Sequence, residues 1–185
     1  MMTTAPLIWL DLEMTGLDPD RDTIIEIGTV VTSADLSVIA EGPCLAVHHP
    51  AAVLKAMDPW CIQQHGQSGL TERVRSSALS MAEAESQTLN FLRRHCAEQK
   101  SPLCGNSVGH DRLFLQKYMP RLYAFVHYRS VDVSSIKELV LRWYPPHMRY
   151  PQKQSKHTVL SDIRESIEEL LFYRKNVFRE PNSEV

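Results

Sequence analysis

The strongest chemical signals in this sequence come from four acidic residues and one histidine. Asp11 and Glu13 lie at the end of an apolar run that begins at Leu7. Side chains two residues apart on a β-strand point to the same face, so this spacing sets two carboxylates side by side. Such a pair is repulsive unless a cation lies between its members. Alone the pair decides nothing, because most Asp-x-Glu tripeptides are solvated strand ends.

Asp111 lies in a segment with helical spacing, 108–118. At about 100° per residue, the apolar side chains of this segment share one face, with Asp111 near its middle: Val108, Phe114, Leu115 and Tyr118. A carboxylate that faces a core is costly unless it is paired or bound to a metal, so we expect a cationic group to meet it. The alternative is an aspartate that caps a helix or pairs with a distant arginine.

His157 and Asp162 lie at the start of a predicted C-terminal helix, 158–176. Five residues apart on one regular helix, they would point roughly 140° away from each other. They can converge only if His157 precedes the helix, carried by the irregular, Pro-containing stretch 144–155, which we interpret as a mobile loop. That position suits a movable general base. For a lone histidine among the eight of this chain, a surface side chain is the alternative.

Clustered carboxylates with a histidine nearby suit the hydrolysis of a phosphodiester. That reaction needs an activated water, in-line attack and relief of negative charge on the departing oxygen, and two divalent ions about 4 Å apart supply all three. Carboxylate oxygens favour Mg²⁺ or Mn²⁺ over zinc, which more often recruits His and Cys. A histidine with a pKa of about 6.5 takes up a proton from water near neutral pH, and His157 is the candidate.

The elements that position these residues follow from apolar spacing and turn signals. We expect strands at 7–12, 24–32, 36–47, 102–105 and 128–132, with a turn at 33–35. We expect helices at 81–96, 108–118, 134–143 with Ser134 as N-cap, and 158–176. The first strand is apolar on both faces, as in the centre of a sheet. This order predicts an α/β fold, an antiparallel meander followed by alternating strands and helices, in which helices flank a mixed sheet.

Composition limits the class of protein and of ligand. The chain has 185 residues, 43% of them hydrophobic, and a net charge of −2. We expect one domain over 1–185, with a core at about 7–177 and short tails. A protein that grips long nucleic acid usually has a basic stripe, so a long duplex is excluded and a ligand with few phosphates is not.

Cysteine usage and the N-terminus bear on the compartment. The four cysteines are widely spaced without a C-x-x-C pair, which predicts reduced thiols: Cys44, Cys61, Cys96 and Cys104. The first six residues lack the basic and apolar blocks of a signal peptide, and no apolar run is long enough to span a membrane. We therefore expect a cytoplasmic protein that does not act at a membrane.

The chain resembles the DEDDh exonucleases, because Asp11-x-Glu13, Asp111 and His157-x-x-x-x-Asp162 follow that family's pattern in its order. Further blocks resemble the oligoribonucleases within it: Trp9–Asp18, Cys104–Arg112, Tyr128–Arg129, Asp132–Ser134 and Asp162–Ser166. The resemblance runs from about Leu7 to Val177. It implies an RNase H-like fold with a five-stranded mixed sheet, two divalent ions (Mg²⁺ or Mn²⁺), a homodimer, and 3'→5' hydrolysis of short single-stranded RNA, from dinucleotides to pentanucleotides, to 5'-mononucleotides.

The resemblance also assigns roles to individual residues. It makes four acids the metal ligands and His157 the general base: Asp11, Glu13, Asp111 and Asp162. Leu17 would wedge against the bases, and His65 and Ser107 would contact the substrate. Three residues would come from the partner subunit, the first to stack on a base and the others to cap the terminal phosphate: Tyr128, Arg129 and Ser134. The alternative for Tyr128 is a plain core residue of a strand.

This sequence departs from the family pattern at three places. His110 replaces a glutamine beside Asp111, Ser161 replaces the first acid of an Asp-Asp pair, and Ser155-Lys156 replaces an approach to His157 that usually contains glycine. His110 adds a second titratable group near the metal site, and the loss of the acid at 161 lowers negative charge without removing a ligand. Lys156 would stiffen the loop or touch phosphate.

Other functions make different predictions. A proofreading or tRNA-trimming exonuclease shares the same five catalytic residues but handles longer strands and should have a more basic surface. An inactive nucleic-acid-binding module should have lost at least one of the five, and all are present. A scaffold whose acids only cap and pair should show no metal-dependent change in stability.

Overall fold

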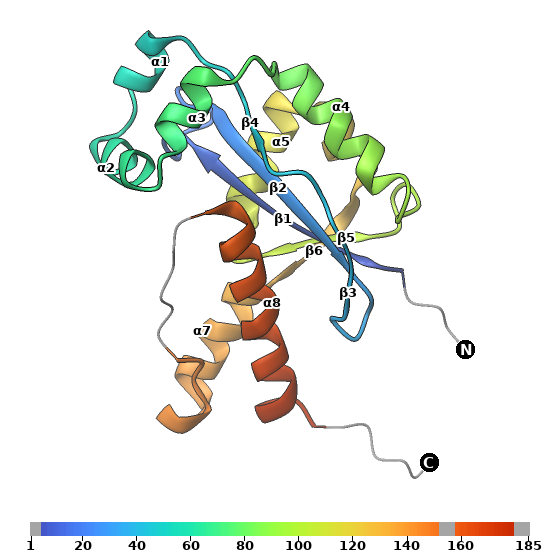
Figure 1. The fold of residues 1–185 in the computed structure, drawn as a ribbon. Helices are drawn as coiled ribbons and strands as arrows, with labels where there is room; N and C mark the ends of the chain where they lie inside the picture. The colour runs from blue at the N-terminus through green and yellow to red at the C-terminus, as the bar shows by residue number, and fades with distance from the viewer. Residues whose placement is uncertain (1–4, 152–157, 180–185) are drawn as a thin grey trace.

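One mixed β-sheet organises the chain, whose computed structural model describes residues 5–151 and 158–179. Its strands lie in the order β3-β2-β1-β5-β6, and the short β4 also pairs with β2 (Figure 1). The strands are β1 (Leu7–Met14), β2 (Ile24–Thr32), β3 (Val38–Glu41), β4 (Leu45–Ala46), β5 (Pro102–Gly105) and β6 (His127–Asp132). β1, β2 and β3 are antiparallel, whereas β5 runs parallel to β1 and β6 parallel to β5. The predicted meander and mixed sheet are confirmed, with β4 as an addition.

Side-chain alternation along β1 divides the core into two layers. Ile8, Leu10 and Leu12 pack into a cluster on one face of the sheet. Trp9 points to the opposite face, where its Nε1 donates to Thr32 Oγ1 at 3.0 Å. Asp11 and Glu13 follow Trp9 by two and four residues along the strand, so both acids point to the same face as Trp9, toward the second layer.

Helices cover both faces of the sheet. The first face carries α4 (Met81–Leu92), α5 (Gly109–Tyr118) and α6 (Pro120–Phe125), and the second carries α7 (Val133–Trp143) and α8 (Val159–Asn176). A third cluster joins the short helices α1 (Ala51–Lys55), α2 (Pro59–Gln67) and α3 (Leu70–Ser76) to Ile25. Between α7 and the end of the first described range lies the 3₁₀ turn η1 (Pro146–Met148).

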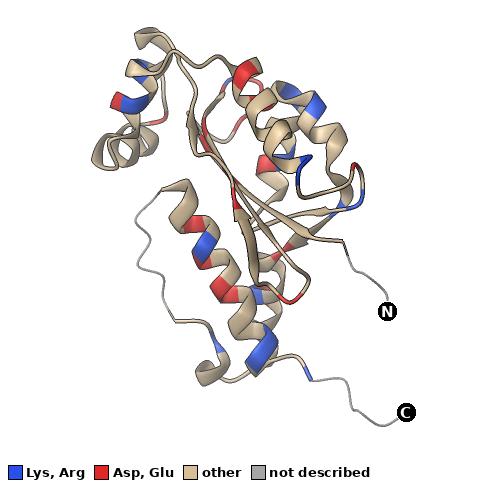
Figure 2. Ribbon diagram, turned by 45° about the vertical axis from the view of Figure 1, so that its right-hand side comes forward, with Lys and Arg blue, Asp and Glu red and all other residues tan. Residues whose placement is uncertain are grey.

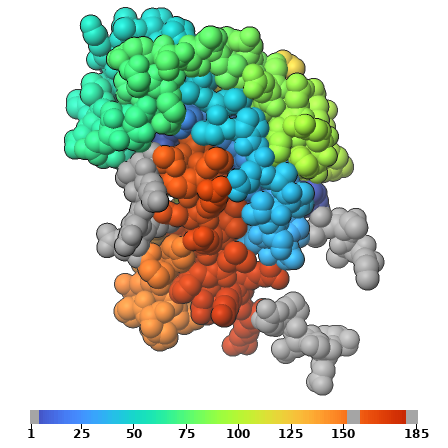
Figure 3. All heavy atoms as spheres, in the orientation of Figure 1, coloured from blue at the N-terminus to red at the C-terminus, as the bar shows by residue number. Residues whose placement is uncertain are grey.

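α8 crosses the sheet and brings the C-terminal part of the chain to β1 and β2. Its surface lies between α7 and the β2–β3 hairpin in Figure 3. Arg164 on α8 binds the Glu41 carboxylate of β3 at 2.8 Å, and Arg174 donates to Asp35 O at 2.9 Å. These contacts hold α8 against β3 and the turn between β2 and β3, on the face of the sheet toward which Asp11 and Glu13 point.

The predicted elements agree with the observed ones except in three respects. The stretch from Leu36 to Val47 is two short strands, and the prediction missed α1, α2, α3 and α6. It also named the wrong cap for α7: the N-cap is Asp132, whose carboxylate accepts from Ser134 N at 2.9 Å.

The four cysteines are free thiols, three of them buried. Within the described ranges, no helix is long and apolar enough to cross a membrane, and the cytoplasmic location stays a prediction.

Candidate active site

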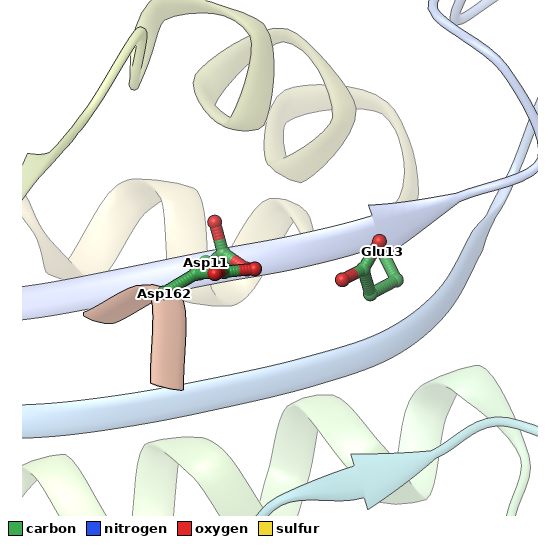
Figure 4. Close-up of side chains that lie close together, drawn as sticks. All are labelled: Asp11, Glu13 and Asp162. Carbon is green, nitrogen blue, oxygen red and sulfur yellow. The ribbon is translucent and has the colours of Figure 1, made fainter. Parts of the chain in front are cut away.

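Three carboxylates from distant parts of the chain meet at the end of β1. Asp11 and Glu13 come from the strand and Asp162 from the first turn of α8, and one oxygen from each lies within 4.8 Å of the others (Figure 4). The strand periodicity fixes the first two, and the N-terminus of α8 brings the third. Carboxylate oxygens at this spacing are the ligand set that hard divalent cations prefer.

Asp111 lies beside this cluster, buried on α5 as its helical spacing predicts. Its side chain is 6% exposed, and Oδ1 accepts from Leu12 N at 3.0 Å. At Oδ1, the partner of Asp111 is therefore a backbone N–H of β1 and not the cationic group that we expected. Because Leu12 lies between Asp11 and Glu13, this bond ties Asp111 to the strand that carries both.

The raised pKa values of these carboxyl groups indicate that a bound positive charge would stabilise the cluster. Burial, and then the charges of Asp111 and its other acidic neighbours, raises the pKa of Asp11 well above its usual range. Burial and the charge of Asp162 raise the pKa of Glu13 to about 8. Burial raises the pKa of Asp111 to about 7, although the hydrogen bond from Leu12 acts in the opposite direction. Bound divalent cations would remove this repulsion, so these residues fit a metal site.

His65, for which the family resemblance implies a contact with substrate, lies against the cluster. It is 3% exposed on α2; its Nε2 donates to Met14 O at 2.9 Å, and its Nδ1 lies 3.8 Å from Glu13 Oε2. Glu26, opposite Glu13 in the β1–β2 register, is also buried and pairs with Arg73 of α3 at 2.9 Å. Both residues therefore lie next to Glu13: His65 is close enough to orient its carboxylate, whereas the charge of Glu26 adds to the repulsion on it.

His157 falls in the range 152–157, outside the described residues. α8 begins at Val159, with Thr158 as N-cap, so His157 precedes the helix as the convergence argument requires. Ser161, which replaces an acid of the family pattern, has a structural role: its Oγ accepts from Thr158 N at 3.3 Å and closes the capping box. His110 is exposed on the first turn of α5. Lys156 is not among the described residues.

Beside the carboxylates, Leu17 and Trp60 form the walls of a hollow of about 620 Å³. Both side chains are largely exposed, Leu17 by 67% and Trp60 by 59%. Two apolar walls suit the flat faces of nucleobases. Sequence reasoning predicted Leu17 but missed Trp60. The signal was available, because Asp58 followed by Pro59 is a typical N-cap and first helical position, and the Asp58 carboxylate does cap α2.

Ser107 and Ser134 lie together at the carboxyl ends of β5 and β6. Ser107 N lies 3.3 Å from Ser134 Oγ and 3.0 Å from an oxygen of Asp132. Ser107 has a φ of 54°, a left-handed conformation uncommon outside glycine. The family resemblance grouped Ser134 with the residues of a partner subunit, but the structure brings it to Ser107 of its own chain.

Tyr128 and Arg129 lie elsewhere, at the start of the edge strand β6. Tyr128 is 73% exposed, so the alternative that it is a core residue is wrong. Arg129 stacks on it, with Cζ 5.3 Å from the ring centroid. The parallel register of β1, β5 and β6 places Tyr128 near the level of Ile8. Tyr128 is therefore roughly 10 Å from Asp11 along the strand direction, and a further roughly 10 Å from it across the sheet, because β6 is two strands away from β1. Tyr128 is therefore out of reach of the acids of its own chain.

Comparison with known proteins gives one consistent result. A family model described as an exonuclease (RNase_T) matches residues 8–170. The oligoribonuclease of Marinobacter nauticus is 54% identical over 173 residues, 94% of this chain and 96% of that protein. The oligoribonuclease of Vibrio cholerae is 56% identical over the same shares of each chain.

Solved structures support the fold. Exonuclease I, without ligand, has a TM-score of 0.73 at 15% identity, and E. coli exonuclease I in complex with a dA16 oligonucleotide has 0.75 at 14%. Each match covers 94% of this chain, which spans 43% and 41% of those longer proteins. At such low identity the similarity concerns the fold alone, and it confirms the predicted RNase H-like architecture.

Proposed function

This chain belongs to the exonuclease family and, within it, to the oligoribonucleases, and we propose that it uses two Mg²⁺ or Mn²⁺ ions to degrade very short RNA. It is a 3'→5' exoribonuclease of short oligoribonucleotides. The observation that supports its chemistry is the meeting of Asp11, Glu13 and Asp162 within 4.8 Å. Asp111 would complete the set of ligands.

Each residue of the cluster would have a defined task. When bound, the divalent ions supply an activated water and relieve charge on the departing oxygen. Asp11 and Glu13, fixed on a rigid strand, would hold the ions with little reorganisation. His157, on the approach to α8, would accept the proton of the attacking water. His65 would keep the Glu13 carboxylate in one orientation from a contact of 3.8 Å.

The preference for short RNA would come from the two sides of the cluster. Bases would stack against Leu17 and Trp60 in the hollow, at about 1–3 kcal/mol for each aromatic contact. Ser107 and Ser134, at the carboxyl ends of two strands, would receive the terminal phosphate of the substrate. A cap of this kind at the end of the substrate would admit a dinucleotide and exclude a long polymer.

We also propose that the enzyme is a homodimer that completes each active site across the subunit boundary. The exposure of Tyr128 and its distance from the acids of its own chain support this arrangement. Tyr128 would stack on a base held by the other copy, and Arg129 would contact its phosphate.

Turnover of an RNA dinucleotide, compared with that of an RNA of about twenty nucleotides, tests the proposal. We expect hydrolysis of the dinucleotide in Mn²⁺ or Mg²⁺, none in EDTA, and far slower loss of the longer strand. Faster turnover of the longer strand would instead favour the proofreading or tRNA-trimming alternative. The scattered Lys and Arg of the described residues in Figure 2, with the net charge of −2, support the shorter substrate.

A further inference from the structure

The carboxylate of Asp22, which also lines the hollow, accepts hydrogen bonds from both ends of the turn that carries Leu17. Its Oδ1 accepts from Thr15 Oγ1 at 3.0 Å and its Oδ2 accepts from Asp18 N at 3.0 Å. These two donors lie at the two ends of the turn, with Leu17 between them. Since the Leu17 side chain is 67% exposed, its own packing does little to fix it. The hydrogen bonds to the Asp22 carboxylate, together with the backbone hydrogen bonds that close residues 15–23, therefore hold the backbone that carries Leu17.

The same network reaches Trp60, a second large apolar side chain that lines the hollow. Thr15 is 4% exposed, its Oγ1 accepts from Thr23 N at 3.0 Å, and its carbonyl oxygen accepts from Asp58 N at 3.1 Å. Asp58 in turn caps α2 by accepting from Trp60 N at 2.9 Å. Leu17 and Trp60 are thus connected through Thr15, and their separation depends on the turn that Asp22 closes.

Two further contacts restrict Asp22 itself. A Cβ on Gly16 would overlap its carboxylate, so the turn packs directly against Asp22 because residue 16 has no side chain. On its other side, the Tyr118 hydroxyl lies within hydrogen-bond distance of the carbonyl oxygens of Asp22 and Pro19. Tyr118 belongs to α5, the helix that also carries Asp111, so the same helix supports both the hollow and one of the proposed metal ligands.

We propose that Asp22 is a positioning residue for substrate: it holds Leu17 at a fixed distance from Trp60, so that a base enters a preformed slot. The inference rests on the proposed function, since it needs the hollow to bind bases. A turn that is ordered before binding loses less entropy on binding, so loss of the clamp should weaken the capture of substrate. The acids that hold the ions stay in place on β1, so the rate at saturation should change little.

Asp22→Asn is the variant that tests this, because an amide keeps the shape of the carboxylate but offers one acceptor for two donors. Asp20→Asn is the matched control: it makes the same change of charge in the same loop, where the Asp20 side chain is 90% exposed. With an RNA dinucleotide and Mn²⁺, we expect KM to rise about tenfold in Asp22→Asn, with kcat within about twofold of wild type. Asp20→Asn should match wild type in both.

A double-mutant cycle with Leu17→Ala shows whether Asp22 acts through Leu17. If it does, adding Asp22→Asn to Leu17→Ala raises KM little further. An unchanged KM in Asp22→Asn, or the same tenfold rise in the Leu17→Ala background, overturns the proposal.

If Asp22→Asn does not fold, Gly16→Ala is the second test, because it keeps every charge and displaces the Asp22 carboxylate. It should raise KM in the same way, and an unchanged KM in Gly16→Ala overturns the proposal too. A wild-type protein that leaves the dinucleotide intact refutes the proposed function itself, and the inference with it.

Discussion

Raising the pH of the metal-free protein from about 5.5 to about 7.5 should destabilise it, because the folded state holds protons that the unfolded chain releases. The ordinary pKa of a glutamate is 4.5, and burial raises that of Glu13 to about 8 in the folded state. Between these values, the folded protein binds one more proton at Glu13 than the unfolded chain does. Stability is therefore lost as the pH rises through this window, which is opposite to the behaviour of an ion-paired carboxylate.

The magnitude follows from the same linkage. One proton corresponds to about 1.4 kcal/mol per pH unit, so two pH units cost about 3 kcal/mol through Glu13 alone. For a domain of this size, the loss corresponds to a fall of about 6–12 °C in Tm. Asp111, whose pKa is raised to about 7, adds to the loss in the lower part of the range. Mn²⁺ should remove most of the effect, because cations stabilise the ionised carboxylates.

Thermal unfolding in EDTA at about three pH values measures this, with Glu13→Gln as the matched control. The glutamine has no proton to exchange in this range, so its curve contains every pH effect except that of residue 13. The difference in Tm between wild type and Glu13→Gln should widen as the pH rises, with the variant more stable at pH 7.5. A constant difference, or a wild type that gains stability relative to the variant, would refute the reasoning.

Three further outcomes are expected. His157→Ala should abolish hydrolysis of the dinucleotide in Mn²⁺ while leaving the unfolding curve unchanged, and a near-normal rate would remove its assignment as the base. Trp60→Ala should raise KM for the dinucleotide by about tenfold, since it removes one stacking wall, and steady-state kinetics would show an unaltered KM if the hollow does not bind bases. Mixing Tyr128→Ala with Asp111→Ala protomers should restore activity in the hybrid dimer that has one intact site, whereas two inactive proteins that stay inactive when mixed would contradict the cross-subunit site.

The sequence predicted the parts of the site that depend on short-range periodicity. The two-residue spacing of Asp11 and Glu13 puts them on one face of β1, and the helical spacing around Asp111 turns it inward. It could not predict the partner of Asp111, since a backbone N–H of β1 leaves no trace in side-chain patterns. Nor could it separate Ser134 from Arg129, because only the fold shows that Arg129 lies near the start of β6 whereas Ser134, on the first turn of α7, meets Ser107.

The short helices α1, α2 and α3 escaped prediction for a related physical reason. Helices of five to nine residues complete too few turns for an apolar stripe to stand out, and packing against Ile25 rather than intrinsic propensity stabilises them. Trp60 is on α2, so missing this helix also left Trp60 out of the predicted site. His65 is on the same helix, and only the position of α2 shows that it lies 3.8 Å from Glu13.

The metal site combines a repulsive cluster with the best-anchored strand of the sheet. β1 is paired along its whole length with β2 and also pairs with β5, and its apolar side chains are buried on both faces. Each such side chain contributes about 1.5–3 kcal/mol through burial, which is enough to offset the mutual repulsion of Asp11 and Glu13. A more flexible segment would relieve that repulsion by turning its carboxylates toward solvent. Because β1 cannot, the carboxylates are held close together, and divalent cations would bind to ligands that are already in place.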